Sequence, residues 1–144
     1  MAPMKSFSAA TTIDATPEAV WAVLTDAPAY PSWNTTVTRV DGRIAQSEKI
    51  TVHARISAGR AFPVKVTTFD APRRMVWTGG MPLGLFKGER SFELAVTPGG
   101  TGVSFSMREE FTGLLAPLTG KSIPDLKPAF DEFAACLTAR AEGN

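Results

Sequence analysis

Apolar residues near the C-terminus recur at the spacing of one helical face. This face of a helix predicted over Leu126–Ala141 carries Leu126, Phe130, Phe133, Ala134, Leu137 and Ala141, with Asp131, Glu132, Thr138 and Glu142 on the other side. We expect Asp125 to cap this helix and Pro128 to lie in its first turn, where a missing amide hydrogen costs little. A helix with such a stripe has to bury it against a large apolar surface supplied by the rest of the chain.

The N-terminal part of the chain changes its hydrophobic period once. Alternation over Ser6–Asp14 predicts a strand, one side of which is made of Phe7, Ala9, Thr11 and Ile13. Thr16 is a favourable N-cap and Pro17 suits the first helical position, so a helix follows, which buries Val20, Trp21, Val23 and Leu24. Residues 26–28 end that helix, and a second short helical turn is predicted over Ala29–Trp33.

Six more strands are predicted after these short helices, because alternating segments are bounded mostly by Gly, Pro, Asp or Ser. They cover Thr35–Asp41, Lys49–Ile56, Phe62–Phe69, Arg74–Thr78, Phe86–Val96 and Val103–Phe111. A chain of 144 residues fits one domain, so residues 1–144 are predicted to form a single one. Its expected class is α+β: a seven-stranded, curved antiparallel sheet around the long C-terminal helix, with a cavity between the two.

The registers of these strands can be predicted from the turns, since opposed residues of an antiparallel pair share a face. A turn over Ser57–Ala61 sets Ile56 opposite Phe62, Ala54 opposite Val64 and Val52 opposite Val66; one over residues 70–73 sets Val66 opposite Trp77 and Thr68 opposite Met75. A turn over residues 97–102 sets Val96 opposite Val103, Leu94 opposite Phe105, Phe92 opposite Met107 and Arg90 opposite Glu109.

These registers combine into one apolar sheet face for the closing helix. The face carries Ile50, Val52, Ile56, Phe62, Val64, Val66, Met75, Trp77, Phe92, Leu94, Phe105 and Met107. The segment Gly79–Leu85 is expected to be a loop that either borders the mouth of a cavity or folds onto the end of the sheet.

Composition and charge narrow the possible partners and locations. The formal net charge is +1 and no basic run exceeds the pair Arg73 and Arg74, so nucleic acid is not an expected partner. Cys136 is the only cysteine, which excludes an internal disulfide and a multi-cysteine metal site and is compatible with a reducing compartment. Residues 1–8 lack the apolar core of a signal peptide, and no apolar run is long enough for a membrane span, so we expect a cytoplasmic protein.

The order of elements and several short segments resemble a known family. The segments are Ile13–Trp21, with the sequence IDATPEAVW, then Asp26, Tyr30, Pro31, Trp33 and Asn34, and Glu109–Gly113 before the final helix. Over nearly its whole length the chain resembles the helix-grip superfamily SRPBCC, which includes START-related lipid carriers, and within it the polyketide cyclase/dehydrase-like branch. This resemblance implies a helix-grip fold with a deep apolar cavity, used by different members for lipids, polyketides, hormones or other small molecules.

The sequence offers few side chains for catalysis or metal binding. His53 is the only histidine, and alternation places it with Thr51 and Arg55, so we expect a surface position instead of a catalytic role. No Gly-rich phosphate loop or dinucleotide fingerprint follows a strand, and neither a cofactor nor a metal is expected. Cys136 lies at the flank of the helical stripe and is predicted to be a packed thiol.

Arg90 and Glu109 are the sharper candidates, because the predicted register sets them opposite each other on an otherwise apolar face. An unpaired charge is costly there, whereas a paired one is tolerated. Such a pair could orient a ligand carbonyl or carboxylate, or assist proton transfer in a cyclase. The alternative is a structural ion pair near the edge of the sheet.

We expect a binder or carrier of a small hydrophobic molecule. The predicted ligand-binding residues are Trp33, Phe62, Met75, Trp77, Arg90, Phe92, Phe105, Met107, Glu109, Phe130, Phe133 and Leu137. Two alternatives stay open: a cyclase or dehydratase acting on a polyketide-like substrate polarised by Arg90 and Glu109, and a protein-interaction module whose cavity is filled by side chains. Catalytic residues are not assigned.

Overall fold

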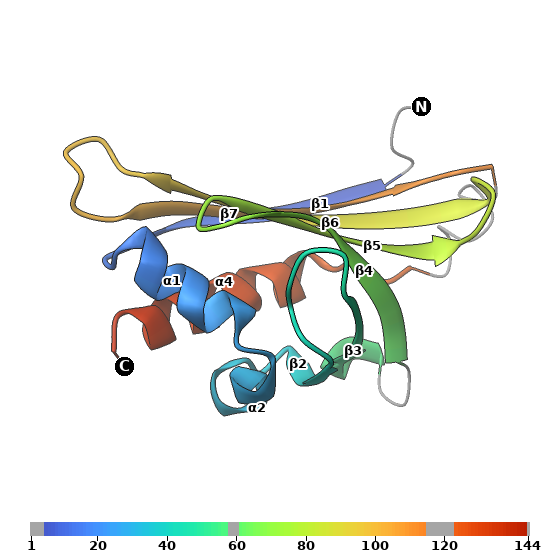
Figure 1. Ribbon diagram of the computed structural model, residues 1–144, viewed down its shortest axis with the longest axis horizontal. Helices are drawn as coiled ribbons and strands as arrows, with labels where there is room; N and C mark the ends of the chain where they lie inside the picture. Colours follow the sequence, from blue (N-terminus) through green and yellow to red (C-terminus); the bar gives the residue numbers. More distant parts are fainter. Residues whose placement is uncertain (1–4, 58–60, 115–122, 144) are drawn as a thin grey trace.

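A computed structural model describes residues 5–57, 61–114 and 123–143 of the chain (Figure 1). In chain order its elements are β1 (Lys5–Ile13), α1 (Pro17–Thr25), the 3₁₀ turn η1 (Ala27–Ala29), α2 (Tyr30–Trp33), β2 (Val37–Asp41), β3 (Lys49–Ala54), the 3₁₀ turn η2 (Arg55–Ser57), β4 (Ala61–Asp70), β5 (Arg74–Met81), β6 (Phe86–Val96), β7 (Val103–Thr112) and α4 (Lys127–Ala141). The predicted order of elements is confirmed.

The strands form one antiparallel, seven-stranded sheet in the order β1-β7-β6-β5-β4-β3-β2. Figure 1 shows β1, β7, β6 and β5 as one layer, from which β4 bends away and carries β3 and β2 beneath it. The helices α1 and α4 lie under that layer, on the concave side of the sheet. This arrangement confirms the α+β helix-grip class, with a long C-terminal helix held by a curved sheet.

Polar groups fix the short helices, and one of them is the N-cap Thr16 that the sequence predicts. Thr16 is the N-cap of α1, and its Oγ1 accepts a hydrogen bond from the backbone nitrogen of Ala19 at 3.1 Å. Tyr30 is fully buried at the start of α2, and its hydroxyl donates to the carbonyl of Leu24 at 2.6 Å. Burial raises the pKa of Tyr30 far above its usual range, against the opposing effect of the Arg90 charge. Tyr30 therefore stays protonated and ties α2 to α1.

The predicted register of the last hairpin is confirmed along its whole length. Val96 pairs with Val103, Leu94 with Phe105, Phe92 with Met107 and Arg90 with Glu109. The pairing of β5 with β6 is continuous as well, because β5 runs on to Met81, which pairs with Phe86. The predicted loop Gly79–Leu85 is therefore strand over its first three residues, and only residues 82–85 form the turn.

The predicted register of β3 against β4 is wrong by four residues. Val52 lies opposite Phe62 and Ile50 opposite Val64, and most of the predicted turn, residues 58–60, lies outside the described residues. The reason is η2, which takes residues 55–57 out of the strand while the backbone nitrogen of Arg55 donates to the carbonyl of Thr36. Because the error is an even number, the residues of β3 and those of β4 up to Val66 keep their predicted face. Ile56 does not, since it lies in η2 and is 48% exposed.

A bulge in β4 changes the other predicted pairing. Val66 lies opposite Trp77 as expected, but the register shifts between Val66 and Thr68, so that Phe69 instead of Thr68 lies opposite Met75. The extra residue turns the Phe69 ring toward the helices, where it packs against Trp21 with ring centroids 5.3 Å apart. The predicted apolar face therefore gains an aromatic side chain that simple alternation had placed outside.

The core forms where α4 meets the sheet. The buried face of α4 consists of Phe130, Phe133, Ala134 and Leu137, and it packs on a sheet surface that includes Phe92, Phe105 and Met107. Leu126 occupies the N-cap position without a capping side chain, which corrects the prediction that Asp125 would cap the helix there. Asp125 still contributes, because its Oδ1 accepts from the backbone nitrogen of Lys127 at 3.1 Å. Pro128 lies in the first turn, as predicted.

Candidate functional site

An ion pair crosses the concave face of the sheet. The strand registers place Phe7, Glu109, Arg90, Trp77 and Val66 side by side on this face, from β1 to β4. Arg90 Nε donates to Glu109 Oε1 at 2.6 Å, and only 21% and 14% of the two side chains are exposed. The prediction that these two charges meet on an otherwise apolar face is confirmed, and they lie where solvent competes little for their hydrogen bonds.

Arg90 keeps donors available for a further partner. Its guanidinium carbon lies 4.8 Å from the centre of the Phe130 ring of α4, a distance typical of a cation–π contact. Within the described part of the chain its hydrogen bonding is limited to Nε, so both Nη groups have no protein acceptor. The Glu109 carboxylate and the Phe130 ring thus hold the Arg90 guanidinium, while its two Nη groups have no hydrogen-bond acceptor among the described residues.

The surroundings of the ion pair differ between its two sides. Toward α1 the next row of the sheet contains Met75, Phe92 and Met107, which are buried and close-packed against the helices. Away from α1 the next row contains Gly79 and Gly88, which pair with each other between Val64 and Phe111. On the side toward the turn that joins β5 and β6, two adjacent positions beside the ion pair thus have no side chain.

Gly79 and Gly88 have different surroundings, so a side chain would meet different obstacles at the two positions. A Cβ atom at Gly79 would lie 2.9 Å from the carbonyl oxygen of Pro63 and 2.8 Å from a methyl group of Val64, so β4 and β5 approach too closely for a side chain. The nearest atoms to a Cβ atom at Gly88 would be those of the Phe111 ring, at 3.2 Å, which is a tight contact, followed by the far oxygen of Glu109, at 3.7 Å. Gly88 therefore packs closely against Phe111, next to the ion pair.

Three buried nitrogen donors near this face have no hydrogen-bonding partner among the described residues. They are Nε1 of Trp33, Nε1 of Trp77 and Nδ2 of Asn34. Trp77 is 2% exposed and lies directly opposite Arg90 in the ladder of β5 and β6. A buried donor without an acceptor is costly, and such groups in native structures call for an explanation, of which a bound molecule is one.

Most predicted ligand-binding residues lie in the packed part of the concave face. Met75, Trp77, Phe92, Phe105, Met107, Phe130, Phe133, Leu137 and Trp33 are all buried. Ring contacts fill this region: Trp33 and Phe92 each lie 5.8 Å from Phe133 between ring centroids, and Trp77 lies 4.8 Å from Phe92. Phe62 is on the predicted face but is 39% exposed, because it sits at the end of β4 beyond the helices. Their role in binding stays a prediction.

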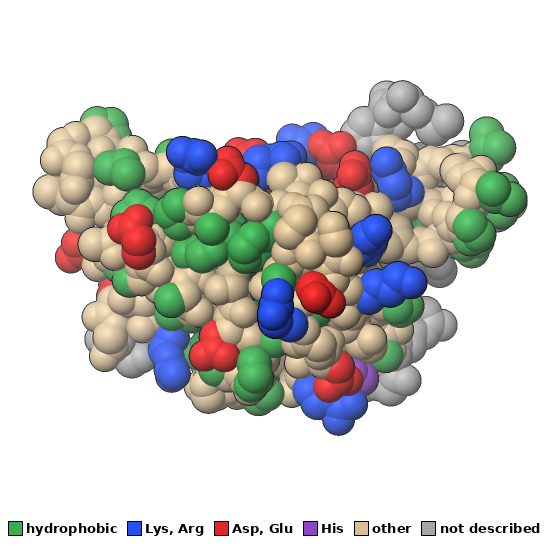
Figure 2. Space-filling model, in the orientation of Figure 1, with side chains coloured by type: hydrophobic (Ala, Val, Ile, Leu, Met, Phe, Trp, Pro, Cys, Tyr) green, Lys and Arg blue, Asp and Glu red, His purple; other side chains and the backbone are tan. Residues whose placement is uncertain are grey.

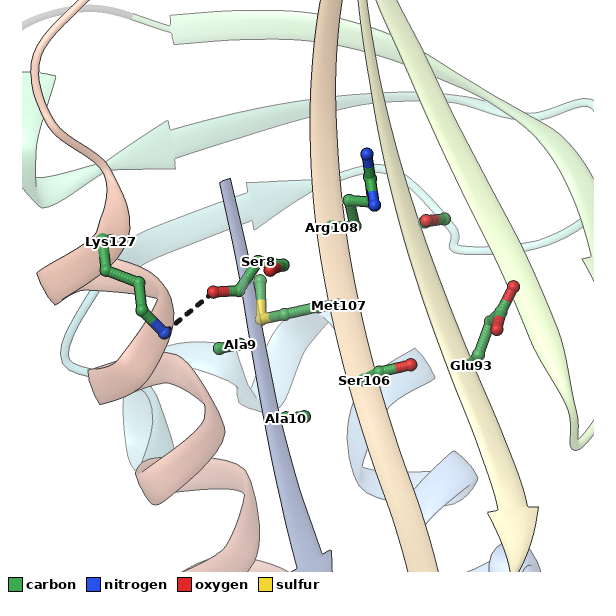
Figure 3. Close-up of a pocket in the computed structure, with 9 residues that line it drawn as sticks. Ser8, Ala9, Ala10, Glu93, Ser106, Met107, Arg108 and Lys127 are labelled. Atoms are coloured by element: carbon green, nitrogen blue, oxygen red, sulfur yellow. Dashed lines mark hydrogen bonds between the residues drawn. The ribbon is translucent and has the colours of Figure 1, made fainter. Parts of the chain in front are cut away.

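Two hollows of the molecule lie on the opposite, convex face of the sheet. The larger, of about 580 Å³, is lined by Ser8, Ala9, Ala10, Ser91, Glu93, Ser106, Met107, Arg108 and Lys127. Figure 3 shows Lys127 reaching from α4 to the edge strand β1, where its Nζ donates to the carbonyl of Ser8 at 3.0 Å. The smaller, of about 190 Å³, is lined by residues including Thr67, Glu89 and Glu110. Neither hollow is the predicted cavity between α4 and the sheet.

His53 lies at the surface as predicted and pairs with a carboxylate. Its Nε2 is 2.9 Å from Asp41 Oδ2, and Arg39 contacts the other oxygen of Asp41 at 2.8 Å. The hydrogen bonds from His53 and then Arg39 lower the pKa of Asp41. This cluster is exposed, and it lies on β2 and β3, on strands remote from Arg90 in the sheet order.

We expect the Asp41 carboxyl to titrate below the range of an unpaired aspartate, so its pairing contributes stability at neutral pH that is lost as pH falls through the lowered pKa. In His53→Gln the Asp41 titration should move up toward that range. NMR detection of the side-chain carboxyl carbons measures both midpoints, with Asp131 as an internal reference. Equal Asp41 midpoints in the two proteins would contradict the pairing.

Cys136 is half-buried and lies 3.4 Å from the hydroxyl of Thr35, in agreement with a packed thiol. The same hydroxyl donates to Glu132, which also accepts from Arg55, so this cluster joins α4 to the turn before β2 and to η2. Across residues 5–57, 61–114 and 123–143 there is no group of three His, Cys, Asp or Glu side chains that could hold a metal ion. The helices described there are too short or too polar to cross a membrane.

Comparisons with known proteins agree with this architecture. The family model described as polyketide cyclase / dehydrase and lipid transport matches residues 4–142. No curated protein sequence matches the chain. Among solved structures, a START superfamily protein from Mycobacterium smegmatis is 16% identical, with a TM-score of 0.67 and with 95% of this chain and 97% of that chain covered.

Two further structures show the same fold. A hypothetical protein, jhp0584, from Helicobacter pylori is 13% identical, with a TM-score of 0.76 over 95% of this chain and 88% of that one. DynU16, a putative protein in the dynemicin biosynthetic locus, is 16% identical, with a TM-score of 0.71 over 98% of this chain and 48% of that one. At these identities the likeness concerns the fold alone.

Proposed function

The chain belongs to the polyketide cyclase / dehydrase and lipid transport family, within the SRPBCC superfamily, and from that premise we propose that it binds a small hydrophobic molecule on the concave face of its sheet. The site proposed is the row of Gly79 and Gly88 together with the neighbouring ion pair. The apolar rim of this site consists of Phe62, Val64, Met81, Phe86 and Phe111, which share the concave face at this end of the sheet.

The observation that carries the proposal is the mostly buried Arg90–Glu109 pair, with unused hydrogen-bonding groups, beside a row that contains two glycines. Arg90 Nη groups can donate and Glu109 Oε2 can accept, so the pair matches a ligand that has a carbonyl oxygen, a hydroxyl group or both. A carboxylate ligand is less suitable, because two negative charges would then share one guanidinium in a poorly solvated place. We therefore propose a largely apolar, uncharged ligand with one polar end.

The proposed occupancy of the concave face can be tested with N-phenyl-1-naphthylamine, an uncharged probe that fluoresces in apolar surroundings. We expect Gly88→Val to weaken probe binding about tenfold or more, since the added side chain would crowd Phe111 on the rim next to the ion pair. The matched control is Ser91→Val on the convex face of the same strand, which lines the larger hollow there. Thermal unfolding of both variants verifies that they remain folded.

The two variants separate the two faces. Loss of probe binding in Gly88→Val with normal binding in Ser91→Val supports the concave site. The reverse result would place the ligand in the convex hollow and would refute the proposal. Native mass spectrometry of freshly purified protein adds an independent result, because a co-purified molecule would give the mass of the natural ligand directly.

The ion pair also favours a second candidate function, a cyclase or dehydratase. In this alternative Glu109 accepts a proton from the carbon beside a substrate carbonyl, and an Arg90 Nη group donates to the resulting enolate oxygen. A thioester of N-acetylcysteamine with several β-keto groups serves as the probe substrate: the enolate carbon bonds to another ketone of the same chain, the oxygen of that ketone takes the proton back from Glu109, and it leaves as water with a second hydrogen of the enolate carbon. Mass spectrometry reports this loss of water. Product formation that continues in Glu109→Gln and in Arg90→Lys would exclude this mechanism.

A further inference from the structure

The hairpin of β5 and β6 ends in a tip without polar side chains. Residues 79–86 read GGMPLGLF, and the first charged residue after them is Lys87. Leu83 is 92% exposed and Met81 is 44% exposed. Leu114, which is 70% exposed, joins the same tip because its backbone nitrogen donates to the carbonyl of Gly84 at 3.0 Å. We call Met81, Leu83 and Leu114 the apolar tip.

The apolar tip projects at one end of the molecule. Figure 1 shows the β5–β6 hairpin reaching beyond the helices at the right-hand end, and Figure 2 shows hydrophobic side chains gathered at that end. The tip is convex, so it offers no recess that a side chain of a protein partner would fill. A fluid surface can adapt to such a shape, and insertion of a few apolar side chains at the end of a hairpin suits the boundary between headgroups and acyl chains.

Leu83 is unfavourable at its position in the free protein for two separate reasons. Its φ is 61°, in the left-handed region where Gly and Asn are favoured and a branched apolar residue is strained. Its side chain is also almost fully in water. Turn formation alone would be better served by Asn or Gly, so the choice of Leu calls for a partner that removes this side chain from water.

The charges next to the apolar tip suit a lipid surface. No charge lies between residues 79 and 86, so insertion of the tip would bury none. Lys87 follows directly on the convex face and is half-exposed, with its Nζ 3.7 Å from Glu89, a distance too long for a strong hydrogen bond. Its ammonium group is therefore available to lipid phosphates just outside the inserted residues.

We propose that the apolar tip docks this protein on a lipid surface, with Leu83 inserted among the acyl chains and Lys87 at the headgroups. Docking rests on the tip alone. The role of this docking rests on the proposed function. Met81 pairs with Phe86 at the rim of the concave site, so the docked protein would exchange an uncharged apolar ligand with the lipid phase without passing the ligand through water.

Co-sedimentation with phosphatidylcholine vesicles, with and without phosphatidylglycerol, tests the docking. We expect the protein to bind both and Leu83→Asn to bind about tenfold or more weakly, since Asn suits the left-handed turn but removes the inserted apolar group. The matched control is Val96→Asn: Val96 is 58% exposed at the opposite end of β6 and lies far from the tip. This variant should bind vesicles like the unmodified protein.

The docking proposal is overturned if the unmodified protein does not bind vesicles, if Leu83→Asn binds them as well as the unmodified protein does, or if Val96→Asn loses as much binding as Leu83→Asn. Binding of N-phenyl-1-naphthylamine in vesicle-free solution separates this result from the proposed function, because Leu83→Asn should leave it unchanged. A variant that binds the probe normally but not the vesicles supports both proposals, whereas vesicle binding without any probe binding leaves the docking and refutes the ligand site.

Discussion

Phe133→Ala is expected to lower the free energy of unfolding by about 4 kcal/mol, within the range measured for deletion of a buried aromatic ring. Phe133 is 1% exposed, and its ring lies within 5.8 Å of Trp33 and of Phe92 and within 6.4 Å of Tyr30, measured between centroids. It is therefore the place where α4, α2 and the sheet meet. Urea denaturation followed by circular dichroism at equilibrium measures the loss.

The matched control for this prediction is Asp131→Ala on the exposed side of the same helix. Asp131 contacts Lys127 at 2.7 Å, but both side chains are more than half exposed, so the pair is worth about 0.5 kcal/mol or less. A loss of less than about 1 kcal/mol in Phe133→Ala would mean that the helix does not depend on this ring contact for its attachment.

The second large effect concerns the ion pair. Glu109→Ala leaves the Arg90 charge in poorly solvated surroundings without its carboxylate and is expected to cost about 2–3 kcal/mol, less than for a fully buried pair because both side chains remain partly exposed. The double variant Arg90→Met with Glu109→Met should cost less than Glu109→Ala alone, since no charge is then stranded. A double-mutant cycle over single and double replacements by urea denaturation gives the coupling directly.

The same variants distinguish a structural pair from a ligand-binding one. If Arg90→Ala and Glu109→Gln lose stability but bind an uncharged naphthyl ketone, whose carbonyl oxygen can accept from Arg90, with unchanged affinity, the pair is structural, and the ligand uses the apolar rim alone. If Arg90→Lys, which keeps the charge but loses the planar fork, weakens binding of this ketone while stability is largely kept, the guanidinium contributes to the site. Additive losses in the double-mutant cycle would contradict a direct energetic link between Arg90 and Glu109.

Much of the candidate site followed from strand alternation. The pairing of Arg90 with Glu109 was predictable because the turn after Val96 is short and rich in glycine, which fixes the register of the last hairpin. The contribution of Gly79 and Gly88 was not recognised, although both glycines fall on the concave face by simple alternation with Trp77 and Arg90. Glycine inside a strand marks close backbone approach or free space, and that signal was available in the sequence.

Other features of the site carried no sequence signal. Whether the indole nitrogens of Trp33 and Trp77 find acceptors depends on ring orientation in the packed core, which no pattern along the chain specifies. The exposure of Phe62 and the position of Ile56 depend on η2 and on how far the helices extend over the sheet. The hollow on the convex face arises where small residues of three strands become neighbours, and strand order alone brings them together.

By itself the sequence determined the class of fold, the number and order of the strands, the apolar side of the closing helix and the face that most strand residues occupy, with Phe69 after the bulge as an exception. These are local properties, because a period of two or 3.6 residues is present in the sequence itself. The face that the period assigns to a residue is unchanged by an even error in register, as between β3 and β4. The tertiary structure alone decided the exact pairing across longer turns, the bulge in β4, and how deeply Arg90 and Glu109 are buried. Those outcomes depend on contacts between residues far apart in the chain, and the local pattern contains no measure of them.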